Sequence, residues 1–170
     1  MKRRAAVAMT EDMPKKKTSP VEREFARLAS VLAQRDPRES SSRRERGLCK
    51  LTESVGVEGG QVLNDLIKFS PELTRYIVDF AYGDVIARDR LDDRTRALVV
   101  VAALAAMGDT QPELRTHVGT ALNAGCTREE ILEVLLIVAV YAGFPRALNA
   151  MATARTAFAA QAKPKTRIAK

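Results

Sequence analysis

Apolar positions recur with helical spacing along most of the chain, and glycine, proline and serine separate the segments. No long stretch alternates apolar and polar residues as a half-buried strand would. The pattern predicts an all-α fold, a compact helical bundle. Its expected helices cover residues 21–34, 47–55, 61–69, 71–81, 93–107, 112–122, 127–142 and 145–160.

Capping signals mark several of these helix ends. Asp92 or Asp93 can cap the helix that follows it, and Thr127-Arg128-Glu129-Glu130 matches the capping box. Asn123-Ala124-Gly125 is typical of a left-handed helix C-terminus. Gly56 and the pair Gly59-Gly60 are interpreted as a break between two helices.

Two of the expected helices, around residues 97–107 and 131–140, are apolar on nearly every side. Such helices are normally buried between neighbours. A chain of 170 residues has too little other structure to cover both. The sequence therefore predicts that the protein forms a homo-oligomer.

The chain divides by charge into three parts. Residues 1–45 form a basic, largely disordered extension with a short helix at 21–34, residues 46–160 form the helical domain, and residues 161–170 form a basic tail. The net charge of +7 comes from the ends: residues 1–47 carry +6, residues 163–170 carry +4, and the part between carries −3. A slightly acidic domain argues against nucleic acid as a partner.

The remaining composition narrows the protein class. The longest apolar run, Ala97–Met107, is shorter than the ~20 residues of a membrane-spanning helix, so no membrane partner is expected. Cys49 and Cys126 form no CxxC pair or Cys/His cluster, and no secretion-signal pattern follows the charged start. These features predict a cytoplasmic protein with reduced, buried thiols and no metal site.

His117 is the chain's only histidine, and Glu113 lies at i−4 on the same helix face. A carboxylate beside an imidazole fixes one tautomer and raises its basicity, as a general base or proton shuttle requires. An exposed surface pair would give the same pattern. The sequence leaves both interpretations open.

Four other residues are candidates for the same site. Arg96 and Arg115 offer planar forks for a carboxylate, although ion pairs with Asp92, Asp93 or Glu113 explain them too. Glu133 lies in an apolar helix, where an acid must be paired or face a cavity, and a structural ion pair is the alternative. Tyr141 can offer its phenol to a pocket or belong to the core.

These residues, in this order, resemble the carboxymuconolactone decarboxylase family of the alkylhydroperoxidase-like superfamily. The resemblance covers residues 47–158. Its strongest matches are Phe80-Ala81-Tyr82-Gly83-Asp84, Arg94-Thr95-Arg96, Glu113-Leu114-Arg115-Thr116-His117, residues 123–131, Glu133-Val134-Leu135 and Tyr141-Ala142-Gly143-Phe144-Pro145.

The resemblance implies a helical protomer in an oligomeric ring, a trimer or hexamer, within aromatic catabolism. It implies decarboxylation of a small carboxylated lactone or related keto acid, with no metal or organic cofactor. Arg96 would bind the carboxylate, His117 would transfer the proton, and Glu133 would orient or tune it. Arg115 and Tyr141 would complete the substrate site.

The chain also departs from the family pattern. Thr110 and Glu113 replace the CxxC pair of the peroxidase branch, so thiol peroxidase activity is not expected. The decarboxylase pattern has a cysteine at Ala142, an Asn-His pair at Leu148-Asn149, and an arginine pair at Leu51-Thr52. These differences leave a non-catalytic scaffold or small-molecule-binding relative as the alternative function.

Overall fold

The computed structural model describes residues 18–35 and 41–162. The predicted disorder of the first residues, the break around residues 36–40 and the tail from residue 163 lie outside the described part. Within it, every regular element is a helix, as the sequence predicts. The helices are α1 (Pro20–Arg35), α2 (Ser41–Ser54), α3 (Gly56–Phe69), α4 (Pro71–Arg75), the π-helix η1 (Tyr76–Ile86), α5 (Asp93–Met107), α6 (Gln111–Asn123), α7 (Arg128–Ala142) and α8 (Phe144–Ala162).

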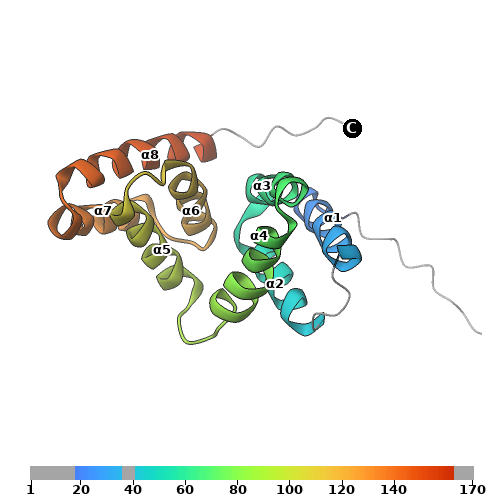
Figure 1. Ribbon diagram of the computed structural model, residues 1–170. Coiled ribbons are helices and arrows are strands. Elements are labelled where there is room, and N and C mark those ends of the chain that lie inside the picture. Colours follow the sequence, from blue (N-terminus) through green and yellow to red (C-terminus); the bar gives the residue numbers. More distant parts are fainter. Residues whose placement is uncertain (1–17, 36–40, 163–170) are drawn as a thin grey trace, which may run out of the picture.

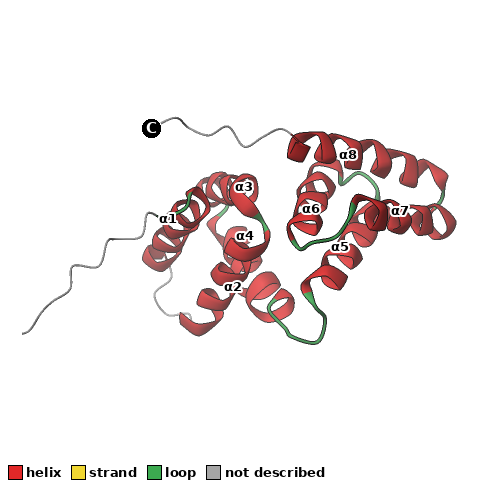
Figure 2. Cartoon of the chain, turned by 180° about the vertical axis from the view of Figure 1, so that it is seen from behind, coloured by secondary structure: helices red, strands yellow, loops and turns green. Residues whose placement is uncertain are grey.

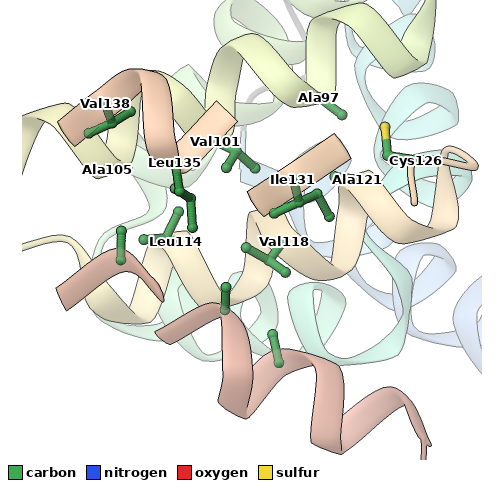
Figure 3. Packing of buried hydrophobic residues seen from close by; sticks show 13 residues of the cluster. Ala97, Val101, Ala105, Leu114, Val118, Ala121, Cys126, Ile131, Leu135 and Val138 are labelled. Atoms are coloured by element: carbon green, nitrogen blue, oxygen red, sulfur yellow. The ribbon is translucent and has the colours of Figure 1, made fainter. Parts of the chain in front are cut away.

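The helices gather into two groups, which lie side by side and are joined by the segment between η1 and α5 (Figures 1 and 2). The N-terminal cluster of buried residues comes from α1, α2, α3 and η1: Phe25, Leu28, Leu32, Leu51, Leu63, Ile67 and Val78. The C-terminal cluster comes from α5 to α8 and the turn before α7, and Val101, Val118, Ile131 and Leu135 lie near its centre (Figure 3). Small alanines on α8 let that helix pack closely against α6 and α7.

The predicted helix caps of the C-terminal half are confirmed. The Asp92 carboxylate accepts a hydrogen bond from the Thr95 amide at 2.9 Å. The Thr127 hydroxyl accepts from the Glu130 amide at 3.1 Å, and the Glu130 carboxylate accepts from the Thr127 amide at 2.8 Å. Gly125 has φ +87° and ends α6 in the left-handed region, which glycine adopts without strain.

The N-terminal half differs from the sequence prediction. Gly59-Gly60 does not break a helix but lies inside α3, and Gly60 packs closely against α1. A Cβ atom on Gly60 would lie 3.3 Å from the ring of Phe25. The helix expected to end near Ala81 continues as η1 to Ile86. The domain boundary predicted at residue 46 falls inside α2.

Helix α2 crosses η1 at very short range. A Cβ atom on Gly47 would lie 2.0 Å from the backbone oxygen of Val78, so only glycine fits there. A buried ion pair holds the same crossing: Arg44 Nη2 lies 2.9 Å from Asp79 Oδ2, and Arg44 Nη1 donates to the Leu32 carbonyl at 3.2 Å. These contacts join α1, α2 and η1.

The helices around residues 97–107 and 131–140, predicted to be buried between neighbours, are only partly buried within the protomer. Each buries one face in the C-terminal cluster and exposes apolar side chains on the other. The exposed set, called here the α7–α8 apolar face, comprises Leu132, Leu136, Ile137, Val140, Tyr141, Phe144 and Leu148. Among the described helices, none combines the length and apolar character needed to cross a membrane.

Candidate functional site

A pocket of about 140 Å³ lies where the two groups of helices meet. It takes residues from the end of α2, the end of η1, the first turns of α5 and the last turns of α6. Its lining residues are Glu53, Ser54, Ile86, Asp93, Arg96, Ala97, Val100, His117, Thr120, Asn123 and Ala124. The lining combines apolar side chains with polar and charged ones, which suits a small molecule that has both polar and apolar parts.

His117 lies on α6 and reaches this pocket, partly buried beneath it. Burial lowers the pKa of its imidazole below the usual value, and the negative charge of Glu113 opposes that shift. The imidazole is therefore neutral near pH 7 in the unliganded protein. A neutral imidazole can accept a proton, and an anion bound beside it would favour its protonated form.

Arg96 lies on α5 and lines the same pocket. Its Nη1 atom donates to Asp93 Oδ1 at 3.0 Å, and its Nη2 atom donates to the carbonyls of Leu91, at 2.7 Å, and Arg88. A guanidinium has five N–H groups, so these three contacts leave two others to offer a ligand. Arg96 thus holds the η1–α5 segment in place and keeps donors near the pocket.

Lys50, Glu53 and Asp93 form an ionic network beside the pocket. Lys50 of α2 lies 2.8 Å from the Asp93 carboxylate and 3.4 Å from Glu53 Oε2. Burial acts to lower the pKa of the Lys50 amine, but the hydrogen bond to Asp93 and the charges of Asp93 and Glu53 outweigh it and raise the pKa. The ammonium form therefore links the two groups of helices across the pocket.

The described residues hold no group of three or more His, Cys, Asp or Glu side chains arranged for a metal ion. Both cysteines are free thiols, Cys49 exposed on α2 and Cys126 buried before α7. Burial and the neighbouring Glu53 carboxylate raise the pKa of the Cys49 thiol. Neither thiol belongs to the pocket lining.

The structure brings together only two of the five predicted site residues, His117 and Arg96. Arg115 is exposed on α6 and lines a separate, wide depression of about 540 Å³, together with Asn149 of α8. Glu133 is exposed on α7, so the expectation of a buried acid is wrong. Tyr141 is 86% exposed at the end of α7. Glu133 and Tyr141 do not line the pocket of His117.

The sequence interpretation missed the contribution of α2. Glu53, Ser54 and Lys50 lie far from His117 along the chain, and only tertiary packing brings them to it. The one local signal is the i, i+3 spacing of Lys50 and Glu53 at the end of a helix. That spacing is common on solvated helix faces and does not by itself indicate a site.

Comparisons with known proteins bear on this arrangement. The family model described as "Carboxymuconolactone decarboxylase family" matches residues 71–156, from α4 into α8. The matched segment includes Arg96 and His117 but not Glu53 or Lys50. The part of the pocket formed by α2 therefore lies outside the family match.

Several relatives share this region. A 4-carboxymuconolactone decarboxylase of Acinetobacter baylyi is 36% identical over 117 residues, which cover 68% of this chain and 87% of that protein. A nitrosuccinic acid decarboxylase of Metarhizium robertsii is 31% identical over 99 residues, 56% of this chain and 68% of the relative. Peroxisomal protein 2 of Schizosaccharomyces pombe is 30% identical over 89 residues, 52% of this chain and 41% of the relative.

Proposed function

The chain belongs to the carboxymuconolactone decarboxylase family, and from this premise we propose that it is a carboxy-lyase that uses no metal or organic cofactor. Its substrate is a small carboxylated lactone or a related keto acid. The observation that carries the proposal is that His117 and Arg96 line one small pocket. The pocket offers a guanidinium for a carboxylate and an imidazole for a proton.

The names of two relatives support the reaction class. One acts on a carboxylated lactone and the other on a nitro acid, and both remove a carboxyl group by name. When CO2 leaves, the electrons of the broken C–C bond need an acceptor next to the scissile carboxylate. An unsaturated lactone, a nitro group or a ketone supplies that acceptor within the substrate, so the protein needs to supply no electron sink.

The protein's own part is to bind, orient and protonate. A remaining N–H group of Arg96 donates to the carboxylate, while the apolar side chains of Ala97 and Val100 face the rest of the molecule. The C–C bond breaks, CO2 leaves, and the electron pair moves into the adjacent acceptor. His117, in its imidazolium form, donates a proton to the resulting carbanion and is reprotonated from water.

Two other mechanisms have less support. A Schiff base with a keto acid needs a neutral amine, whereas the raised pKa keeps Lys50 as an ammonium. Thiol peroxidase chemistry needs a paired cysteine near His117, and Thr110 and Glu113 occupy the CxxC positions of that branch.

We further propose that the protomer assembles into a homo-oligomer, a trimer or hexamer, through the α7–α8 apolar face. Val140 and Tyr141 on this face are 77% and 86% exposed, an unusual state for adjacent large side chains. In such an assembly, Glu133 and Tyr141 of one subunit would approach a neighbouring subunit. The proposed roles of Glu133, Arg115 and Tyr141 in the site depend on that approach.

The test of the proposed reaction is release of CO2 from small carboxylated lactones and from small β-keto acids. Replacement His117→Ala is expected to lower turnover by roughly 10²–10⁴, since His117 is the proposed proton donor. Arg155→Ala, an exposed change on α8, is the control and should retain wild-type turnover. Unchanged turnover in His117→Ala would remove the imidazole from the mechanism.

A second candidate function is a non-catalytic, small-molecule-binding relative of the same fold. Two observations favour it: Ala142, Leu148 and Asn149 replace polar or thiol groups of the decarboxylase pattern, and the pocket of about 140 Å³ is smaller than the roughly 300 Å³ of common ligand sites. Binding of a carboxylate without any CO2 release from the acids above would support this function instead.

A further inference from the structure

The charges around the pocket of His117 show no positive excess before any ligand enters. Two carboxylates, Glu53 and Asp93, and one guanidinium, Arg96, line it. Lys50 does not line the pocket but contacts both carboxylates. Among the described residues, these two negative and two positive charges sum to zero while His117 is neutral, and Glu113, which acts on the imidazole, adds a further negative charge.

The helix ends at the pocket do not add an excess of positive charge. The pocket includes Glu53 and Ser54 at the C-terminal end of α2, and Thr120 and Asn123 near that of α6. Carbonyl groups at helix C-termini carry partial negative charge. The opposite end of α5 is also at the pocket, but the carboxylate of Asp92 already accepts a hydrogen bond from the Thr95 amide there.

The pocket therefore offers hydrogen-bond and charge partners for one carboxylate of a ligand but not for a second one. The first carboxylate accepts a hydrogen bond from a remaining N–H group of Arg96, and protonation of His117 compensates its charge. A second carboxylate would meet Glu53, whose side chain is 57% exposed at the pocket rim. No other cation lines the described pocket.

We propose that Glu53 is a specificity-determining residue that restricts this pocket to acids presenting a single carboxylate. The inference rests on the proposed function, because it names the substrate class of the same site: a monocarboxylic acid whose scissile carboxylate is the one bound near Arg96. The carboxymuconolactone and nitrosuccinic acid of the relatives' names each carry two carboxyl groups. Glu53 lies outside residues 71–156, the segment that the family model matches.

The chain contains one histidine, so the proton NMR signal of its imidazole reports directly on this pocket. Untagged protein is titrated with butyrate and, separately, with succinate, which has the same number of carbons and one more carboxylate. Ionic strength is held constant, because exposed charges are screened by salt. The wild-type protein is expected to bind butyrate more tightly than succinate.

The variant Glu53→Gln removes the negative charge of this side chain and keeps its shape. It is expected to raise the affinity for succinate relative to butyrate about tenfold, equivalent to about 1.4 kcal/mol. The control Glu129→Gln removes the same charge from an exposed site on α7 and should leave the ratio unchanged. Glu53 is largely exposed, and an unaltered circular dichroism spectrum checks that the variant is folded.

Succinate binding as tightly as butyrate to the wild-type protein would overturn the proposal without any variant. An unchanged ratio in Glu53→Gln, or no histidine shift with either acid, would also overturn it. The CO2 assay tests the reaction separately. Preference for butyrate without CO2 release from any acid would support the role of Glu53 and contradict the decarboxylase function.

Discussion

The imidazole of His117 faces two opposing influences. Burial favours its neutral form, whereas the charge of Glu113 one turn away favours its protonated form, and burial is the stronger. A proton donor for a carbanion must hold its proton only after the substrate is in place. A pKa below the usual value, raised by the arriving carboxylate, fits that requirement.

The lowered pKa of His117 makes stability depend on pH. Unfolding returns the imidazole to its ordinary pKa, near ~6.5, so the unfolded chain binds more protons than the folded one between the two values. The free energy of unfolding should therefore fall as pH drops from about 7.5 through the depressed pKa, and level off below it.

Urea unfolding at about pH 7.5 and about pH 5.5 measures this change. The variant His117→Gln, which keeps a polar side chain of similar size without titrating, should lose less stability over the same interval. Equal losses in the two proteins would show that other groups cause the pH dependence.

The family resemblance places His117 and Arg96 in one site, and the two residues line the same pocket. Local patterns alone predict less. The apolar neighbours Leu132 and Val134 predict a buried Glu133, but α7 turns only one face inward. The inward face depends on how helices pack, and the local pattern of a nearly all-apolar helix does not specify it.

Among the helices, α2 and η1 pack so closely at Gly47 that a Cβ atom there would collide with the backbone of η1. Gly47 has the Val78 carbonyl where its Cβ would be, whereas Gly119 inside α6 has open space, with the nearest atom 3.8 Å from where a Cβ would lie. Replacement of each glycine by alanine therefore distinguishes the effect of close helix packing, at Gly47, from the effect of helix propensity, at Gly119.

Replacement Gly47→Ala should lower the free energy of unfolding by about 1–3 kcal/mol or more, because α2 and η1 must move apart. Gly119→Ala should raise it by about 0.5–1 kcal/mol, since alanine loses less backbone entropy in a helix. Urea unfolding of both variants checks this, and a stable Gly47→Ala protein would mean that the crossing relaxes easily.

Helix ends are more predictable from the sequence than helix interiors. The Thr127 capping box and the left-handed Gly125 depend on neighbouring residues alone, and both are present. The local pattern does not reveal the π-helical form of η1, the continuity of α3 through Gly59-Gly60, or the close contacts of η1 with α2 and of α3 with α1. Those contacts arise between segments distant in sequence.

On the scale of the molecule, the α7–α8 apolar face is the basis of the proposed oligomer. Its exposed side chains come from consecutive turns of one helix and the start of the next. Surfaces of this kind commonly belong to interfaces between subunits.

Sedimentation of the wild-type protein should therefore give a species larger than a monomer. Val140→Glu places a charge in the middle of the face and should weaken association at least about tenfold, because a buried unpaired carboxylate is unfavourable. Gln61→Glu, at an exposed polar position of α3, is the matched control. A monomeric wild-type protein would contradict the proposed oligomer.

The pocket of His117 belongs to neither cluster alone, because its walls come from the helices on both sides of the η1–α5 segment. A small acid bound there, as proposed above, would contact helices of both groups at once. Its affinity would then depend on how the two groups are positioned relative to each other, although each group has its own hydrophobic core.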